Sequence, residues 1–333
     1  MYPDIPIWLS VAFIVVGLVA LAWSADAFVA AAGTIARALG ISPFVIGMVI
    51  IGFGTSAPEL CVSALAGLSG HSNLSLGNAF GSCIFNIACI LGMAALIRPL
   101  TVKPAVVWVA APMLTLTSLA SGLLVGLGDG FSRLDGVLDL VLFIVLMPLY
   151  CWFDQRTKPA ASMPSEEQAS TRKALLGAWI MLAVGLALLI GSSHVLVWGC
   201  VDMARTCGVS ELLIGLTIVA IGTSLPELAS AVASARRGEH EFVLGNIIGS
   251  NLFNALAVVG LAGTISPFKD VSRYVLLRDM PVLAVLSLSI AFFGFSRRAS
   301  GTISRGKGFL WLLIFLAYTV VMIMQELSTY NGG

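Results

Sequence analysis

Charged residues are scarce in this chain of 333 residues. Only 11% of the residues are charged, whereas 58% are hydrophobic and the mean hydropathy is +0.99. Soluble domains carry about 25% charged residues. So few charges could not cover the surface of a soluble fold, and the composition therefore predicts a multi-pass protein of the lipid bilayer. The net charge of +1 gives no argument for a nucleic-acid partner, and we expect none.

Patterns that mark disulfide frameworks, zinc sites and enzymes are also missing. The six cysteines form no CxxC pair and mostly lie in apolar segments, which favours packing roles. The sequence contains no nucleophile–base set and no paired catalytic aspartates, so we expect neither enzymatic activity nor a cofactor. No lysine or arginine precedes the first apolar run near Ile5, which indicates a membrane span and not a cleaved signal peptide.

Long apolar runs, in contrast, are frequent. A helix needs about 20 residues to cross a hydrocarbon core of about 30 Å. Runs of this order predict ten transmembrane helices, near residues 6–28, 43–68, 75–97, 105–127, 135–153, 175–201, 211–235, 243–265, 279–295 and 308–325. The one soluble-looking segment, residues 154–174, is predicted to be a flexible linker between two five-helix halves, residues 1–153 and 175–333.

The two halves are repeats of each other. Residues 46–60, IGMVIIGFGTSAPEL, align with residues 214–228, IGLTIVAIGTSLPEL. Residues 77–92, GNAFGSCIFNIACILG, align with residues 245–260, GNIIGSNLFNALAVVG, at the same offset of 168 residues. Because each half has an odd number of spans, the second half is predicted to enter the membrane in the opposite sense. Inverted repeats are typical of secondary transporters, whose substrate sites lie near the bilayer midplane.

The positions of lysine and arginine predict the orientation. Of the eighteen, thirteen lie on the side of the membrane opposite the termini and five lie on the side of the termini. Cytoplasmic loops carry the excess of basic residues. We therefore expect a protein of the cell (inner) membrane with both termini outside and the central linker in the cytoplasm.

Two carboxylates, Glu59 and Glu227, lie deep inside apolar spans and are repeat partners. A carboxylate at the bilayer centre costs on the order of 2.5–3.5 kcal/mol, so a purely structural role explains the pair poorly. Hydroxyl groups precede each carboxylate by four and three residues and share its helix face. These hydroxyls belong to Thr55 and Ser56 in the first half and to Thr223 and Ser224 in the second.

A proline in each motif frees a backbone carbonyl. Pro58 has no N–H and clashes with the carbonyl of Gly54, and Pro226 does the same to Gly222. Such carbonyls are tolerated inside a membrane only when they are buried in protein or line a cavity. Carboxylates, hydroxyls and carbonyls are hard oxygen ligands that suit sodium or calcium, and the absence of histidine and cysteine disfavours zinc or copper.

The next span in each half carries a polar row and two glycines. The polar row has i, i+4 spacing and comprises Asn78, Ser82 and Asn86, and Asn246, Ser250 and Asn254. Ion contact and hydrogen bonding between helices are both open for Ser82, Asn86, Ser250 and Asn254. The glycines form GxxxG pairs, Gly77 with Gly81 and Gly245 with Gly249, and are predicted to allow close helix packing.

The doubled motif, GTSAPE…GNAFGSCIFN and GTSLPE…GNIIGSNLFN, resembles the alpha repeats of the calcium/cation antiporter superfamily, in its prokaryotic sodium/calcium exchanger-type branch. The resemblance covers essentially the whole chain, with the motifs at residues 52–92 and 220–260. It implies ten helices in two inverted halves, with helices 2, 3, 7 and 8 forming the ion site. It also implies a ligand set of Thr55, Ser56, Glu59, Thr223, Ser224, Glu227, Ser82, Asn86, Ser250 and Asn254, with the backbone carbonyls of Gly52 and Ala220.

The chain departs from the family at three places. Asn254 stands where potassium-dependent exchangers have an aspartate, which disfavours potassium co-transport. Gly81 and Gly249 replace the glutamate of the proton-coupled branch, which favours sodium as the coupling ion. Cys83 stands in the first half at the position that corresponds to Asn251 in the second half, so the two halves differ chemically there.

The sequence thus predicts a secondary active antiporter that exchanges sodium for calcium, the two ions being its transported partners. A proton-coupled calcium/cation antiporter is the main alternative, and a cation channel is a weaker one. Asp26 and His194 also pair at the offset of 168. They are more simply explained as polar residues near the membrane interface, and the alternative is that they line an ion entrance. Asp139, near the start of a span, is expected to lie close enough to water to need no role. The oligomeric state is left open.

Overall fold

The computed structural model of the chain describes residues 6–70, 72–126, 130–156, 172–208, 218, 220–268, 271–296 and 300–331. Nearly all of these residues are helical, which confirms the predicted all-helical membrane fold. Eight helices are long and apolar enough to cross a membrane, and one bent pair of helices adds a ninth span within the described residues.

The elements follow the predicted spans closely. The first half contains α1 (Ile7–Leu39), α2 (Pro43–Ile46), the π-helical turn η1 (Gly47–Ile51), α3 (Gly52–Thr55), α4 (Ala57–Leu68), α5 (Ser72–Phe85), η2 (Asn86–Leu91), α6 (Gly92–Ile97), β1 (Leu100–Val102), η3 (Val106–Ala110), α7 (Ala111–Gly126) and α8 (Arg133–Arg156). The second half contains α9 (Arg172–Thr206), α11 (Ala220–Gly222), α12 (Leu225–Arg237), α13 (His240–Leu252), η7 (Phe253–Val258), α14 (Val259–Ile265), η8 (Val275–Asp279), α15 (Met280–Gly294), β2 (Gly301–Ile303) and α16 (Arg305–Asn331).

Two predicted segments fall partly outside the described residues. Of the span predicted at 211–235, the part from Ala220 onward is described and forms α11 and α12. Of the predicted linker 154–174, residues 157–171 lie outside the described part, and the residues on either side continue α8 and α9.

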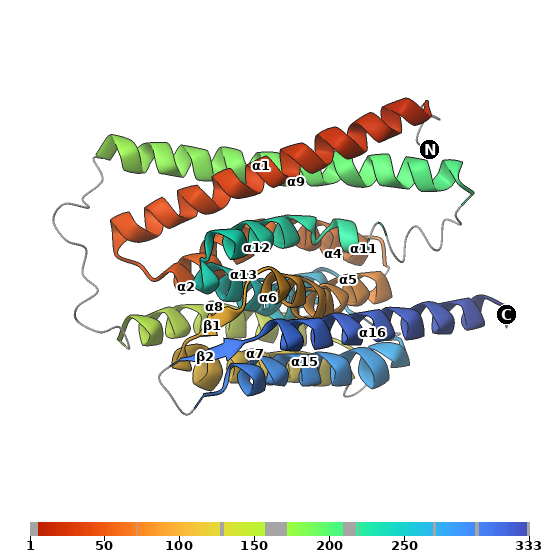
Figure 1. The fold of residues 1–333 in the computed structure, drawn as a ribbon. Helices are drawn as coiled ribbons and strands as arrows, with labels where there is room; N and C mark the ends of the chain where they lie inside the picture. The colour runs from red at the N-terminus through yellow and green to blue at the C-terminus, as the bar shows by residue number, and fades with distance from the viewer. Residues whose placement is uncertain are drawn as a thin grey trace.

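The helices are stacked in layers (Figure 1). The long helices α1 and α9 cross each other and form an outer layer. On the opposite side, α7, α8, α15 and α16 form another outer layer. The elements that carry the repeated motifs lie between these layers, and residues 242–260 of the span that runs from α13 to α14 are all buried. The two carboxylates of the motifs, Glu59 and Glu227, are fully buried in protein.

Helices α1 and α9 are longer than predicted, with 33 and 35 residues. A 33-residue helix is about 50 Å long, so each helix is longer than a hydrocarbon core of about 30 Å. Glycines bring the two helices together, because a Cβ built on Gly17 of α1 would lie 2.8 Å from the backbone nitrogen of Leu196. At the other contact, a Cβ on Gly199 of α9 would lie 2.9 Å from the carbonyl oxygen of Ser10.

The predicted close approach of the second GxxxG pair is present. A Cβ built on Gly245 would lie 2.3 Å from the carbonyl oxygen of Phe44, and one on Gly249 would lie 2.3 Å from that of Met48. Helix α13 therefore packs backbone to backbone against α2 and η1. For Gly77 and Gly81, no atom of the described residues lies within 4 Å of such a Cβ, so their packing role stays a prediction.

Asp139 corrects an expectation from the sequence. Its side chain is fully buried in α8, and its Oδ2 accepts a hydrogen bond of 2.7 Å from Ser121 of α7. The cause is tertiary packing, because Gly136 of α8 and Gly260 of α14 let the two helices approach closely. A Cβ on Gly136 would lie 2.6 Å from the carbonyl oxygen of Gly260. Although Asp139 lies near the start of its span, its side chain therefore has no contact with water.

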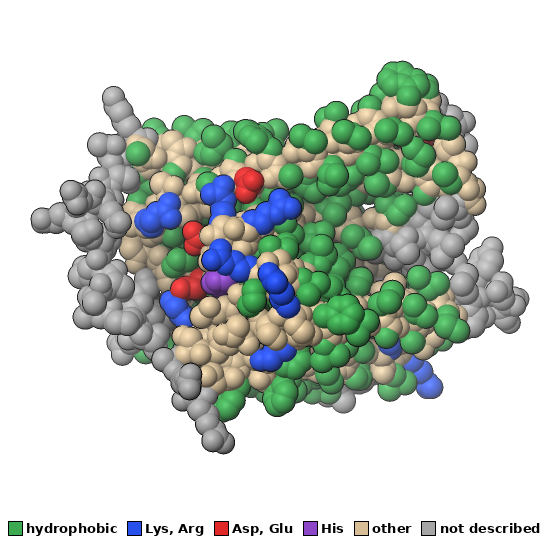
Figure 2. Space-filling view, in the orientation of Figure 1, with side chains coloured by type: hydrophobic (Ala, Val, Ile, Leu, Met, Phe, Trp, Pro, Cys, Tyr) green, Lys and Arg blue, Asp and Glu red, His purple; other side chains and the backbone are tan. Residues whose placement is uncertain are grey.

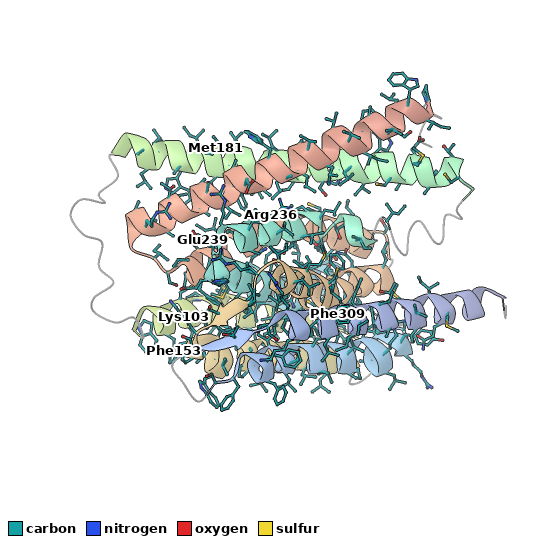
Figure 3. All side chains as sticks on the ribbon, viewed as in Figure 1. Lys103, Phe153, Met181, Arg236, Glu239 and Phe309 are labelled. Carbon is teal, nitrogen blue, oxygen red and sulfur yellow. The ribbon has the colours of Figure 1, made fainter. Side chains whose placement is uncertain are left out.

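Most of the lysine and arginine side chains visible in Figure 2 gather toward one end of the molecule. Lys103, Arg236 and Glu239, labelled in Figure 3, lie in this region. Ion pairs join neighbouring elements here, between Lys103 and Glu241 at 2.6 Å and between Arg237 and Asp26 at 3.4 Å. Helix α1 begins and α16 ends at the opposite end of the molecule (Figure 1).

Candidate functional site

Both motif helices are interrupted at the serine before the proline. Helix α3 ends at Thr55, Ser56 has φ −84° and ψ 8°, and α4 leaves at an angle of 45°. In the second half, Ser224 has φ −94° and ψ 11° between α11 and α12. Because the proline removes one N–H donor two residues after each serine, the helical ladder cannot continue through this point. The breaks predicted from Pro58 and Pro226 are therefore present.

The two carboxylates lie at these breaks and reach across to the other half. Glu59 and Glu227 are both fully buried. The hydroxyl of Ser56 donates to Oε1 of Glu227 at 2.8 Å, and the hydroxyl of Ser224 donates to Oε1 of Glu59 at 2.8 Å. Each carboxylate is thus held by the serine at the other break, so four residues that lie up to 171 positions apart in the sequence form one cluster.

Four buried oxygens of this region have no hydrogen-bond partner among the described residues. They are Oε2 of Glu59, Oε2 of Glu227, Oδ1 of Asn86 and Oδ1 of Asn254. Buried polar atoms in folded proteins are almost always paired, and orphaned ones call for an explanation such as a bound ion. Two of the four belong to carboxylates, and among the described residues no lysine or arginine forms an ion pair with either. This donor set suits a cation.

Two asparagines brace the carboxylate helices. Nδ2 of Asn78 donates to the carbonyl oxygen of Glu59 at 3.1 Å and to the hydroxyl of Ser63 at 2.9 Å. Nδ2 of Asn246 donates to the carbonyl oxygen of Glu227 at 3.4 Å and to the hydroxyl of Ser230 at 2.9 Å. The asparagines follow the repeat, but the serines do not, because residue 231 is the repeat partner of Ser63 and is an alanine.

Helix α13 also contacts the first break directly. Thr55 donates to the carbonyl oxygen of Ile51 at 2.9 Å and lies 3.3 Å from Oδ1 of Asn246. The hydroxyl of Ser250 donates to the carbonyl oxygen of Gly52 at 3.2 Å, and the amide of Ser56 donates to the same oxygen at 3.1 Å. The hydroxyl oxygen of Thr55 lies 3.4 Å from the same carbonyl oxygen, so the carbonyl of Gly52, one of the predicted ligands, is already surrounded by hydrogen-bonding groups in this structure.

The remaining predicted ligands lie around the second break. The hydroxyl oxygen of Ser224 also lies 3.2 Å from that of Ser82, and Nδ2 of Asn86 donates to Oδ1 of Asn251 at 2.9 Å. Asn254 is fully buried. Thr223 lies at the break itself and is partly buried, and Ala220 begins α11. The structure thus brings the first-half ligand candidates and Ser224, Glu227, Ser250 and Asn254 into one region.

The freed carbonyl of Gly222 is bonded by a helix that the sequence did not connect with the site. The hydroxyl of Ser193 in α9 donates to this carbonyl oxygen at 3.0 Å. The repeat partner of Ser193 is Ala25, which cannot donate, so a search for repeated polar residues misses this contact.

Ser193→Ala is expected to lower the thermal unfolding midpoint of the purified protein in detergent. The variant leaves a buried carbonyl without its partner, which costs about 1–3 kcal/mol. Ser192→Ala is the matched control, because among the described residues the hydroxyl of Ser192 donates to the carbonyl oxygen of Leu189 in its own helix and not to another helix. Equal midpoints for the two variants would contradict a stabilising role of the Ser193 contact.

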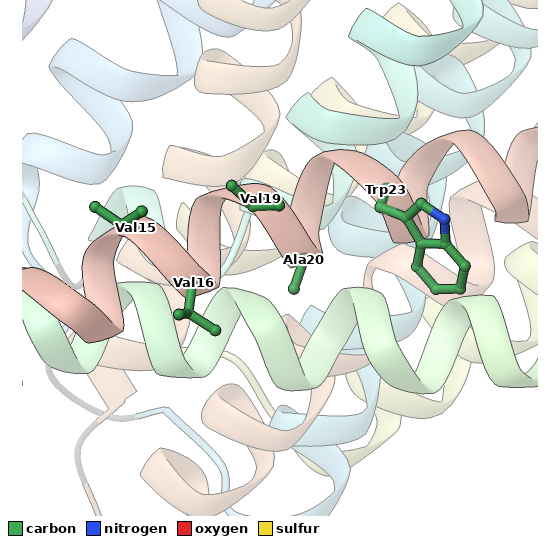
Figure 4. Close-up of a pocket in the computed structure, with 5 residues that line it drawn as sticks. All are labelled: Val15, Val16, Val19, Ala20 and Trp23. Carbon is green, nitrogen blue, oxygen red and sulfur yellow. The ribbon is translucent and has the colours of Figure 1, made fainter.

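An apolar hollow on the outside of α1 takes no part in this site. It is lined by Val15, Val16, Val19, Ala20 and Trp23 (Figure 4). Its only polar side-chain atom is the indole nitrogen of Trp23, and its side chains are largely exposed on the helix surface. A surface of this kind faces lipid tails in a membrane protein and offers no ligand to an ion.

Comparisons with known proteins show what this chain is similar to. Residues 9–152 and 177–324 match the model of the family described as sodium/calcium exchanger protein. The chain is 39% identical over 312 residues to CaxA of Alkalimonas amylolytica, described as a candidate antiporter, with 93% of this chain and 97% of CaxA covered. It is 35% identical to the inner membrane protein YrbG of Escherichia coli, with 95% of this chain and 99% of YrbG covered.

Solved structures give the same result. A structure of the sodium-calcium exchanger NCX_Mj superimposes with a TM-score of 0.80 at 31% sequence identity, covering 96% of this chain and 99% of the exchanger. The matched segments include both helix breaks and all residues of the carboxylate cluster. The chain therefore belongs to the sodium/calcium exchanger family of membrane transporters.

Proposed function

We propose that this protein is a secondary active antiporter that exchanges sodium for calcium by alternating access. Its site is formed by the second, third, seventh and eighth of ten transmembrane helices, arranged as two inverted five-helix halves. The ligands are the residues predicted from the motifs, with Glu59 and Glu227 at their centre. The carrying observation is the reciprocal contact of the two helix breaks, from Ser56 to Glu227 and from Ser224 to Glu59.

The charge of the site explains why exchange results. Two buried carboxylates carry a charge of about −2, and an uncompensated buried charge is strongly unfavourable. One calcium ion or several sodium ions neutralise the pair, but both kinds of ion together would overcompensate it. Because the ions compete for the same oxygens, calcium leaves as sodium loads. An ion-free site is the costly state, which suppresses movement of the empty carrier.

The broken helices suit a transport site. Discontinuous helices near the midplane are common in secondary transporters, because backbone groups at the break and nearby side chains can surround an ion. The two breaks here are related by the 168-residue repeat and contact each other directly. This supports an inverted arrangement in which each half exposes the shared site to one side of the membrane.

The charge distribution supports the proposed orientation. Basic residues lie toward one end of the molecule and include Arg98, Lys103 and Arg237. The start of α1 and the last residues of α16 lie toward the opposite end. Basic residues are more frequent on the cytoplasmic side. We therefore propose a protein of the cell membrane, as the relative YrbG is of the inner membrane, with both termini outside and the linker in the cytoplasm.

Calcium flux in proteoliposomes tests the function. Vesicles loaded with sodium and diluted into sodium-free medium containing radioactive calcium should accumulate calcium, because sodium leaves down its gradient. Potassium-loaded vesicles should not. Uptake driven equally well by a pH gradient alone would favour proton coupling in place of sodium. Net conductance without counterflow would favour a channel.

A further inference from the structure

One polar position next to the candidate ligands differs between the two repeats. The polar rows agree at Asn78 and Asn246, at Ser82 and Ser250, and at Asn86 and Asn254. At the positions directly after Ser82 and Ser250, however, the two halves differ, because Cys83 in α5 is the repeat partner of Asn251 in α13. Both side chains are fully buried. This difference has a direct consequence for the two candidate ligands Asn86 and Asn254.

The first-half amide is fixed in one orientation. Nδ2 of Asn86 donates to Oδ1 of Asn251 at 2.9 Å, and Nδ2 of Asn251 donates to the carbonyl oxygen of Cys83 at 3.1 Å. Asn251 can accept from Asn86 only while its own amide nitrogen points toward Cys83, so the two amides orient each other. The polar atom of Asn86 that remains without a partner is the oxygen Oδ1. Asn86 is therefore held as an oxygen donor.

The second-half amide has no such support. Both Nδ2 and Oδ1 of Asn254 are buried and have no hydrogen-bond partner among the described residues. The residue that would correspond to Asn251 is Cys83, whose Sγ donates to the carbonyl oxygen of Asn251 at 3.5 Å. A thiol is a weak hydrogen-bonding group and supplies no amide oxygen for Asn254. No described contact therefore selects which end of the Asn254 amide meets an ion.

The side chains at positions 83 and 251 each donate to the backbone carbonyl oxygen of the other residue. Nδ2 of Asn251 lies 3.1 Å from the carbonyl oxygen of Cys83, and Sγ of Cys83 lies 3.5 Å from the carbonyl oxygen of Asn251. An asparagine at position 83 would therefore occupy a place that mirrors that of Asn251. From there its Oδ1 is positioned to accept from Asn254, as Oδ1 of Asn251 accepts from Asn86.

We propose that Asn251 is a positioning residue that fixes Asn86 as an oxygen ligand, and that Cys83 leaves its partner ligand Asn254 unfixed. The pair at positions 83 and 251 thereby sets the calcium affinity of the site and makes its two halves unequal. This inference rests on the proposed function, because it deepens the account of the same site. Pre-oriented ligands bind more tightly, since no free energy is spent on orienting them when the ion arrives.

Three variants test the proposal in the sodium-driven uptake assay. Asn251→Cys is expected to raise the calcium concentration for half-maximal uptake about tenfold, with the maximal rate changed less than twofold. Cys83→Asn is expected to lower that concentration severalfold, because it fixes Asn254. The double variant Cys83→Asn/Asn251→Cys moves the orienting asparagine to the other half. Its calcium concentration for half-maximal uptake should lie within about threefold of that of the original chain.

Cys83→Ala is the matched control, because it removes the thiol without supplying an amide, and its half-maximal concentration should not change. A double variant no better than Asn251→Cys alone would overturn the proposal, since a packing defect would not be rescued by exchange. If Asn251→Cys does not fold, Cys83→Asn alone tests the proposal. An unchanged or raised calcium concentration for half-maximal uptake in Cys83→Asn would contradict it. Absence of sodium-driven uptake by the original chain would instead refute the proposed function.

Discussion

Glu59→Gln is expected to abolish sodium-driven calcium uptake, with a loss of at least about 100-fold, and Glu227→Gln is expected to do the same. Glutamine keeps the size of the side chain and one oxygen but removes the negative charge. A calcium ion would then face one buried carboxylate instead of two, and its remaining charge would be uncompensated at the centre of the membrane. The measurement is initial uptake of radioactive calcium into sodium-loaded proteoliposomes.

Asp139→Asn supplies the matched control for this result. Asp139 is also a fully buried carboxyl group in a membrane span, but it accepts its hydrogen bond from Ser121, and no described hydrogen bond joins it to either helix break. The same chemical change there should leave calcium uptake within about twofold of the original rate. Normal calcium uptake by either glutamate variant would contradict the proposal that Glu59 and Glu227 are the central ligands of the transported ion. Equal losses in all three variants would point to a general requirement for buried acids.

The reciprocal contacts add a symmetry requirement to the glutamate prediction. Because each carboxylate is held by the serine of the other half, the two glutamine variants should have effects of similar size. The double variant should be no worse than either single variant, since each alone already removes the charge balance needed for a divalent ion. Residual calcium uptake confined to one single variant would mean that one carboxylate alone supplies the transported charge.

The sequence predicts the part of this site that local chemistry determines. Pro58 and Pro226 fall inside long apolar spans, and a proline in the interior of a helix interrupts the hydrogen-bond ladder, so an interruption near Ser56 and Ser224 could be predicted without a structure. The 168-residue repeat also identified Glu59 and Glu227 as partners. That they are held by each other's serines could not be predicted, because the contact depends on how two segments more than 160 residues apart pack.

Sequence reasoning also missed contacts that do not follow the repeat. Ser193 bonds the carbonyl of Gly222, while its repeat partner is an alanine. Asp139 is buried because Gly136 lets α8 approach α14, although its position near a span end suggested water. In each case the environment is created by a helix distant in sequence. Periodicity describes one chain segment, and repeat symmetry relates equivalent positions of two segments, so neither carries information on such a neighbour.

Helix packing around α13 sets the second large effect that we expect. Gly249→Ala should lower the thermal unfolding midpoint and the yield of monodisperse protein, and should reduce calcium uptake at least tenfold. The added Cβ would lie 2.3 Å from the carbonyl oxygen and 2.7 Å from the Cα of Met48. Both are backbone atoms, so no side-chain rotation relieves the clash and α13 must move away from η1. Overpacking of this kind costs about 1–3 kcal/mol or more.

The loss of transport should exceed what the loss of stability explains. Helix α13 carries Asn246 and Ser250, which contact the first break at Thr55 and Gly52 over distances of 3.2–3.3 Å. A small displacement of α13 therefore separates ligands that belong to different halves. Uptake is measured per folded protein, after size-exclusion chromatography, so that activity and yield are separated. Folded Gly249→Ala protein with normal uptake would show that the site tolerates this displacement.

Gly191→Ala is the matched control, in helix α9. Gly191 is exposed, and no atom of the described residues lies within 4 Å of a Cβ built on it. Alanine is more favourable than glycine inside a helix by about 0.5–1 kcal/mol, so this variant should keep or raise the unfolding midpoint. The same substitution thus has opposite expected signs at two membrane glycines. The sign depends on whether a neighbouring backbone occupies the space that the missing side chain leaves.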